Sequence, residues 1–284
     1  MESFLGAGAK RQNGLQGRAW PLAPVRHCLR SWAITAGSLW PASRNPFVRC
    51  IYLHNVTERE RPAFRQLLRE IKNRGEVIST PALTEILKDA HPPPGRYFHL
   101  SFDDGFAGAV CDAAAIMVEE KAGATFFVAT GFVADAEDDL GIGTIANRAR
   151  SGTRRPASWS ELRQAAAAGF EIGSHSHSHA SLAGFSGDTA RLKLEIAGSK
   201  AIIEQQTGAP CIAFAWPSGR SRDFDAASAR IVQQAGFSAC FSGVRGSVVA
   251  GRTDCLSIPR HLIEAGWPVA HQRAFLAGQW EGRG

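Results

Sequence analysis

Ser101-Phe102-Asp103-Asp104-Gly105 ends a short apolar segment, residues 97–100, whose composition predicts a β-strand. Asp is depleted in strands and is rarely buried without a partner. Two adjacent carboxylates at the end of a core strand therefore indicate a site that requires negative charge, and a metal cation is its natural partner. The glycine that follows allows a sharp turn, at which both carboxylates can reach one pocket.

Three histidines, His175, His177 and His179, occupy alternate positions further along the chain. On a continuing strand all three rings would share one face, whereas in a helix that begins after Gly173 the first and third would share one face. We favour a helix or a turn, because Gly173 and the serines interrupt the apolar segment 170–172. Two imidazoles and one carboxylate leave a coordination position open, as in catalytic zinc sites. The alternative is a solvated loop without chemical significance.

The two motifs resemble those of the polysaccharide deacetylases with the NodB homology domain, carbohydrate esterase family 4. Residues 101–105 are similar to that family's Thr/Ser-Phe-Asp-Asp-Gly, and residues 175–179 to its His-Ser/Thr-x-x-His. The resemblance extends from about residue 50 to about residue 278. It implies a distorted (β/α)7 barrel. It also implies a catalytic base and a divalent metal ion, with zinc as the first expectation and cobalt, nickel or manganese as alternatives. By this resemblance the base is Asp103 and the metal ligands are Asp104, His175 and His179.

A third motif of the family is matched in a variant form by Phe-Ala-Trp-Pro-Ser-Gly at residues 214–219. The resemblance implies that the backbone N–H of Ser218, after the motif's proline, stabilises the oxyanion of the reaction. Trp216 is expected either to wall the substrate pocket or to pack in the core. Ala215 stands where the family most often has an arginine that orients the catalytic Asp. Arg260 is our candidate substitute, because a guanidinium can bind a carboxylate bidentately from another strand.

Three further histidines are candidates for the same site. His261 is our candidate for the general acid that protonates the leaving amine, because His changes charge near neutral pH. Its match to the family's Leu-x-His motif is imperfect, and a structural role is the alternative. His54 ends the first predicted strand and faces the same barrel mouth if the register holds, where it would contact substrate or surround the metal. His177 is expected to point away or to support the ligands.

The rest of the chain from residue 50 alternates short apolar strands with amphipathic helices, which predicts a parallel α/β barrel with its chemistry at the carboxyl ends of the strands. Strands are predicted at residues 50–54, 77–78, 97–100, 125–128, 170–172, 211–215 and 238–241, and helices at 61–73, 81–89, 106–122, from 158, 188–206 and 226–235. Residues 135–156 are a polar insertion, which we expect to form a loop over the site.

Composition agrees with one catalytic domain. The chain has 284 residues, of which 44% are hydrophobic, enough for one sizeable core. We divide it into a basic amino-terminal extension, residues 1–45, and a catalytic domain, residues 46–284. The six cysteines include no Cys-x-x-Cys pair, so buried free thiols in a reducing, cytoplasmic compartment are expected.

Charge is concentrated at the amino terminus. Residues 1–49 hold seven basic residues and one acidic residue, which accounts for the whole net charge of +6. The remainder of the chain is therefore neutral, and its composition is not that of a nucleic-acid-binding protein. No signal peptide or transmembrane stretch is evident. Residues 20–42 combine basic residues with tryptophans at helical spacing, which suggests peripheral contact with an anionic membrane. The alternatives are a helix that closes the barrel and a disordered extension.

These features together predict a metal-dependent hydrolase that removes an N-acyl group, first of all acetyl, from an amino sugar of a glycan or glycoconjugate. One alternative is the hydrolysis of another non-peptide amide, such as a formamide or a ring amide. The other is a catalytically silent carbohydrate-binding module on the same fold, for which the alanine at position 215 is the only argument.

Overall fold

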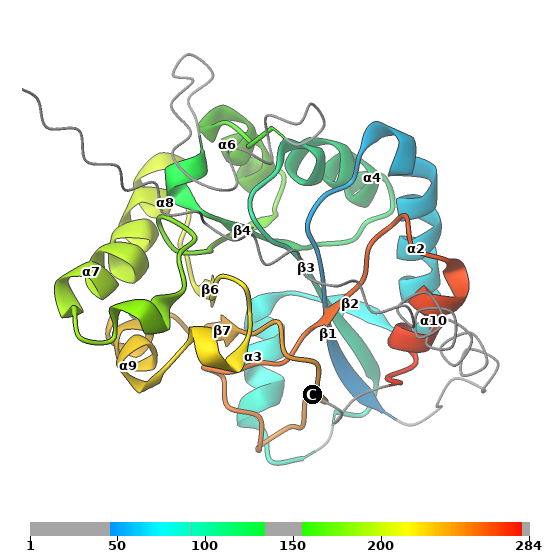
Figure 1. Ribbon diagram of the computed structural model, residues 1–284. Coiled ribbons are helices and arrows are strands. Elements are labelled where there is room, and N and C mark those ends of the chain that lie inside the picture. The colour runs from blue at the N-terminus through cyan, green and yellow to red at the C-terminus, as the bar shows by residue number, and fades with distance from the viewer. Residues whose placement is uncertain (1–45, 92, 134–154, 280–284) are drawn as a thin grey trace, which may run out of the picture.

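The computed structural model of the chain describes residues 46–91, 93–133 and 155–279 (Figure 1). The predicted amino-terminal extension, its membrane-contacting segment and nearly all of the predicted loop 135–156 lie outside these residues, so those predictions stay untested. Within the described ranges, no helix combines the length and the apolar character that a membrane span needs.

Eight parallel strands of the described residues form one curled sheet, in the order β7-β6-β5-β4-β3-β1-β8, with β2 paired to β3. The strands are β1 (Phe47–Leu53), β2 (Glu76–Ile78), β3 (Arg96–Phe102), β4 (Thr125–Val128), β5 (Glu171–Ser174), β6 (Ala213–Ala215), β7 (Ala239–Phe241) and β8 (His261–Leu262). The segment before β8 also contacts the end of β7, because Ser242 N donates to Ile258 O at 2.8 Å. The predicted distorted barrel is confirmed.

The two faces of the sheet have separate cores, because side chains alternate along each strand. The inner core lies inside the barrel and includes Cys50, Phe127, Ala213, Ala215, Ala239 and Phe241. The outer core packs against the helices and includes Ile51, Leu53, Leu100, Phe102, Phe126, Ile172 and Phe214. On β3, His99 stacks on the inner Phe241 ring at 4.8 Å, so the same alternation directs Ser101 and then Asp103 inward.

Helices cover the outer face of the sheet (Figure 1). They are α2 (Arg61–Arg74), α3 (Thr80–Lys88), α4 (Ala114–Glu119), α6 (Trp159–Ala167), α7 (Thr189–Lys193), α8 (Ser199–Thr207), α9 (Ala226–Gln234) and α10 (Val269–Leu276). A capping box at Ser158 begins α6, where the sequence predicts a helix. Helix α3 is different: its Leu83 and Leu87 pack in the inner core, so this helix contributes to the barrel interior rather than to the outer layer.

Two predicted helices are interrupted. The segment predicted as one helix over residues 106–122 contains a π-helical turn, Gly108–Ala113, before α4. The segment predicted as one helix over residues 188–206 contains a second one, Leu194–Gly198, between α7 and α8. A π-turn inserts one extra residue, which a hydrophobic period of 3.6 does not reveal. Strand β8 and helix α10 were not predicted, since β8 has only two residues.

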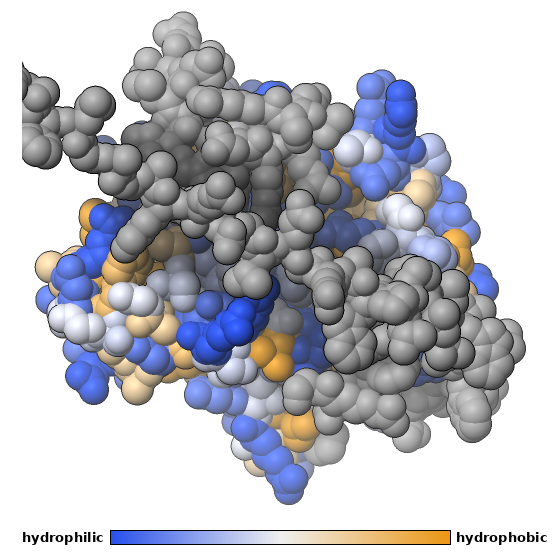
Figure 2. All heavy atoms as spheres, viewed as in Figure 1, coloured by the Kyte–Doolittle hydropathy of each residue, from blue (hydrophilic) through white to orange (hydrophobic). Residues whose placement is uncertain are grey.

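The cysteines agree only partly with the prediction of buried thiols. Cys50, Cys211 and Cys240 are buried free thiols, but Cys255 is exposed. Among the coloured residues of Figure 2, hydrophilic ones are the more extensive and apolar ones form separate patches. The large hydrophobic side chains that are exposed in the described residues, Val118, Leu194, Val249 and Val269, are distributed over different elements.

Candidate active site

A turn after β3 brings both carboxylates of the Asp-Asp-Gly motif to the mouth of the barrel. Asp103 N donates to Leu53 O of β1 at 2.9 Å, which extends the sheet ladder by one residue. Asp104 and Gly105 then both adopt left-handed backbone conformations, each with a φ of 74°. In a continuing strand the two side chains would point to opposite faces. The left-handed turn removes that alternation, as the sequence analysis expected.

Asp104, His175 and His179 form a cluster whose potential ligand atoms all lie within 4.8 Å of one another. Asp104 Oδ1 lies 3.6 Å from His175 Nε2 and 3.2 Å from His179 Nε2. Ligand bonds of about 2.1 Å in a tetrahedral site would separate two ligand atoms by about 3.4 Å. Two of the three separations are close to this value, so the cluster is suited to one divalent ion.

Protonation in the cluster also suits a metal ion. His175 Nδ1 donates to Ala215 O at 2.7 Å, which leaves the lone pair of Nε2 directed toward Asp104. Burial lowers the pKa of His175 to about 4, so the ring is neutral at pH 7. Burial raises the pKa of Asp104, but the hydrogen bond from His179 and the charges of the histidines outweigh it and lower that pKa to about 2. A neutral His175 ring and an ionised Asp104, with His179 as the second imidazole, are the donor types expected of a catalytic zinc site.

The histidine segment is a turn and not a helix. β5 continues to Ser174, and the chain then bends, with left-handed backbone at Ser176 and His179. The helical alternative for this segment was therefore wrong, and His175 and His179 are brought together by an irregular loop. His177 lies outside the cluster: its Nδ1 is 2.8 Å from the hydroxyl of Thr130.

Arg260 binds both oxygens of Asp103. Its Nη1 lies 2.7 Å from Oδ1 and its Nη2 lies 2.8 Å from Oδ2, and both side chains are buried. The guanidinium also donates to Ser242 O at 2.7 Å and to the hydroxyl of Ser101 at 3.1 Å. The Tyr52 ring lies 4.4 Å from its central carbon. The sequence analysis proposed Arg260 as the substitute for the arginine that is missing at position 215. Arg260 makes the expected bidentate contact with Asp103.

His54 lies beside these carboxylates and pairs with an acidic residue that the sequence analysis missed. It follows β1, which runs in register with β3 so that Leu53 pairs with Phe102 and His54 comes level with Asp103. Its Nδ1 donates to Glu264 Oε1 at 2.7 Å. Burial lowers the pKa of His54, but the hydrogen bond to Glu264 and the charges of Asp104 and Asp103 outweigh burial and raise it. The ring is therefore within electrostatic range of both site carboxylates.

His261 lies on the other face of the sheet. It pairs with Ile51 in the register of β1 and β8, and Ile51 belongs to the outer core. Paired residues of neighbouring strands have side chains on the same face, so the buried His261 ring lies on the helix side, while Arg260 points inward. This geometry does not support His261 as the general acid. The structure places His261 away from the candidate site, because a shift of one residue along a strand moves a side chain to the other face of the sheet.

Comparisons with known proteins identify the family of the chain. The family described as polysaccharide deacetylase matches residues 90–240, which include the Asp-Asp pair, both histidines of the cluster and the third motif. The chain belongs to the polysaccharide deacetylase family. No curated protein matches the chain.

Several solved structures share its fold. IcaB from Ammonifex degensii is 22% identical, with a TM-score of 0.62 over 82% of this chain and 98% of that one. The BpsB deacetylase domain from Bordetella bronchiseptica is 18% identical, with a TM-score of 0.62 over 79% and 98%. The Streptococcus pyogenes deacetylase PplD, in complex with acetate, is 18% identical, with a TM-score of 0.61 over 81% and 97%.

The family's third motif forms a tight turn at the same end of the barrel. Ser218 and Gly219 have left-handed backbones, with φ of 62° and 66°. Gly243 N donates to Gly219 O at 2.8 Å, and a Cβ on Gly219 would lie 2.4 Å from that nitrogen, so only glycine fits there. Within the described ranges, the Ser218 N–H donates no hydrogen bond, so it is available to an oxyanion.

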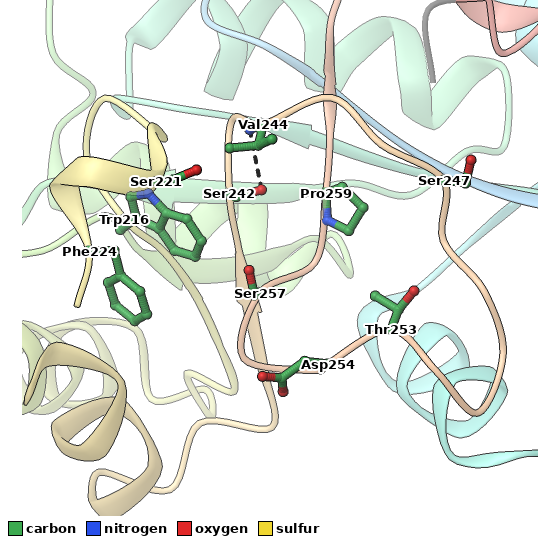
Figure 3. Close-up of a pocket in the computed structure, with 10 residues that line it drawn as sticks. All are labelled: Trp216, Ser221, Phe224, Ser242, Val244, Ser247, Thr253, Asp254, Ser257 and Pro259. Atoms are coloured by element: carbon green, nitrogen blue, oxygen red, sulfur yellow. Dashed lines mark hydrogen bonds between the residues drawn. The ribbon is translucent and has the colours of Figure 1, made fainter. Parts of the chain in front are cut away.

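Trp216 packs more deeply than a simple pocket wall. It is buried, stacks on Phe224 with ring centroids 4.3 Å apart, and donates from Nε1 to Arg220 O at 3.2 Å. Its edge still lines a hollow of about 450 Å³, which the loop between β7 and β8 encloses on the other side. Figure 3 shows the Trp216 and Phe224 rings on one side of it and Ser257 and Asp254 on another.

The missed residue Glu264 had a recognisable signal. Leu262-Ile263-Glu264 has the spacing of the family's Leu-x-His motif, with Glu in the place of His. The ring that such a motif would bring to the barrel mouth is supplied here by β1 instead. His54 and Glu264 thus place an imidazole and a carboxylate where the family pattern led us to look for His261.

Proposed function

We propose that this polysaccharide deacetylase hydrolyses the N-acetyl group of an amino sugar in a glycan or glycoconjugate, using a divalent ion held by Asp104, His175 and His179. The observation that carries the proposal is this three-ligand cluster beside the Asp103–Arg260 pair. A divalent ion in this cluster supplies a Lewis acid for the amide carbonyl and lowers the pKa of water toward neutrality.

Asp103 accepts the proton of the attacking water in this proposal. Arg260 occupies one lone pair on each carboxylate oxygen and fixes the plane of the group, and each oxygen keeps a second lone pair for the water. The backbone N–H of Ser218 donates to the oxygen of the tetrahedral intermediate.

His54 protonates the leaving amine. A ring at the barrel mouth, held by Glu264 through Nδ1, can present a proton on Nε2 to the substrate. The carboxylate of Glu264 stabilises the imidazolium and fixes the ring orientation. His54 thus takes the role that the sequence analysis gave to His261.

The presence of Arg260 on Asp103 favours an enzyme over a silent binding module. The alanine at position 215 was the only argument for a module, and the guanidinium from the segment before β8 makes up for the missing arginine. Hydrolysis of a different amide would use the same groups, so the substrate itself must be tested.

The test measures acetate and formate released from N-acetylated and N-formylated amino-sugar oligomers. We expect acetate release from the former, loss of activity after treatment with a chelator, and recovery when Zn²⁺ or Co²⁺ is added back. Formate release alone would support the alternative amide. If folded protein with bound metal releases neither acetate nor formate, the proposal is contradicted.

The role of His54 predicts an effect that depends on the leaving group. We expect His54→Gln to reduce turnover of an N-acetylated sugar by about 10²–10⁴, because general acid catalysis typically contributes that factor. Hydrolysis of an aryl acetate should change little, since a phenolate leaves without a proton. Initial rates on both substrates, with metal content measured in the same samples, check the prediction.

A matched control is available at the opposite end of the barrel. His91 precedes β3 and also pairs with an acidic residue, Asp89, with Nδ1 3.0 Å from Oδ1, but its side chain is 88% exposed. His91→Gln should leave both rates unchanged. Equal losses on the amide and the ester in His54→Gln would show that the ring acts in structure or binding and not as the acid.

A further inference from the structure

The loop that carries two of the three proposed ligands has an unfavourable backbone. Ser176 and His179 adopt φ of 66° and 57°, a region that non-glycine residues rarely enter. Such conformations persist only where the surrounding structure enforces them. The position of the His179 ring therefore depends on the contacts that hold residues 176–179.

One side of this loop is held by the turn after β4. Thr130 N donates to Ser176 O at 3.2 Å, and Gly131 N donates to His177 O at 2.8 Å. A Cβ on Gly131 would lie 2.9 Å from that carbonyl oxygen, so the two backbones are in direct contact. These bonds satisfy the carbonyl groups of the loop, and its N–H groups require acceptors elsewhere.

The acceptor on the other side is the carboxylate of Glu195, which is fully buried. Its Oε2 accepts from His177 N at 3.1 Å and from Ser178 N at 2.8 Å. Its Oε1 accepts from the hydroxyl of Ser178 at 2.7 Å and pairs with Arg191 Nη2 at 2.8 Å. Two successive backbone N–H groups that converge on one anion form the concave arrangement that proteins use to bind anions.

The backbone of Glu195 belongs to the π-helical turn Leu194–Gly198 between α7 and α8. Single π-turns inside helices are frequently found at functional sites, since the extra residue changes the direction of the side chains around it. A carboxylate withdrawn from water is costly unless several groups donate to it. Three of the four contacts of the Glu195 carboxylate are with the ligand loop, and one is with Arg191 of its own helical segment. The carboxylate therefore mainly stabilises the ligand loop.

We propose that Glu195 is a positioning residue of the metal site: its carboxylate holds the backbone between His175 and His179 in the conformation that directs His179 toward Asp104. The inference rests on the proposed function only in taking these three residues as the metal ligands. Within the described residues, Glu195 touches none of the three ligand side chains, and it acts through the main chain of His177 and Ser178.

The test is the Zn²⁺ affinity of Glu195→Gln, measured by competition with a chelator. An amide of the same shape cannot accept from all of these donors, because its NH₂ group is itself a donor. We expect affinity to fall about 10–100-fold, the usual loss when groups that orient metal ligands are removed. The visible spectrum of the Co²⁺ form should also change, because the ligand geometry changes.

Glu171→Gln is the matched control. Glu171 begins β5, the same strand that leads to the ligand loop, and also accepts from a backbone N–H and a hydroxyl, those of Thr80 and Thr125, both at 2.9 Å. Its replacement tests the loss of such contacts at the other end of the strand. Wild-type affinity in folded Glu195→Gln would overturn the proposal, and so would equal losses in the two variants.

If Glu195→Gln does not fold, Glu195→Asp provides the measurement, because it keeps the charge and shortens the reach by one methylene. Wild-type Zn²⁺ affinity in this variant would overturn the proposal as well. Metal binding by the wild-type chain is measured first. Its absence would contradict the proposed metal site itself, whereas wild-type affinity in the variants would contradict only the role of Glu195.

Discussion

His175→Ala and His179→Ala are each expected to remove most of the bound divalent ion, from about one per chain in the wild-type protein. Each variant keeps two of three protein ligands, which is fewer than catalytic zinc sites use. The loss should be larger for His175, because its Nε2 is oriented by the bond from Nδ1 to Ala215 O. Deacetylation should fall with metal content.

Metal analysis of the purified proteins after dialysis against limiting Zn²⁺ checks this expectation. His177→Ala is the control within the same loop: its ring contacts Thr130 and lies outside the cluster, so it should keep its metal. Equal metal content in all three variants and the wild type would refute the ligand assignment.

The cluster itself could be predicted from the sequence because each half of it is local. An Asp-Asp-Gly turn at a strand end and a His-x-x-x-His segment at another strand end are both visible as short motifs. Parallel strands bring their carboxyl ends to one edge, so the two halves must meet whatever the details of the turns. For the same reason, the prediction of the cluster did not depend on the local conformation of residues 175–179, although the helical alternative for them was wrong.

The groups around the cluster depend on register and on long-range contacts, which no short motif encodes. Arg260 and His261 are neighbours in sequence, yet one points into the barrel and the other toward the helices. The sequence offered both for the site and could not separate them. Glu264 meets His54 only because β8 pairs with β1, and the two residues of β8 are too few for a periodic signal.

The role of Glu195 could not be predicted from the sequence for a different reason. In the sequence it is one of the polar residues of an amphipathic segment, for which a solvated position is the ordinary expectation. The π-turn places it in the interior instead, against the ligand loop. A local insertion of one residue changes which face of a helix is buried, and the resulting contacts appear only once the structure is known.

Asp103→Asn is expected to abolish turnover while the metal is retained, whereas Asp104→Asn should lose both. Asp103 lies outside the ligand cluster, so its replacement removes the proton acceptor and leaves the three ligands in place. The loss of general-base assistance alone reduces the rate by about 10²–10⁴. Rates are compared per metal-loaded, folded protein, which separates the two carboxylates.

Stability must be measured in the same variants, because Asp103→Asn leaves the buried charge of Arg260 without its anion. Removing one partner of a buried pair typically costs about 3–5 kcal/mol. Ser242 O, the Ser101 hydroxyl and the Tyr52 ring still hold the guanidinium, so we expect a lower melting temperature but a folded protein at 25 °C. If folded, metal-loaded Asp103→Asn kept near-normal turnover, another group would have to accept the proton of the water.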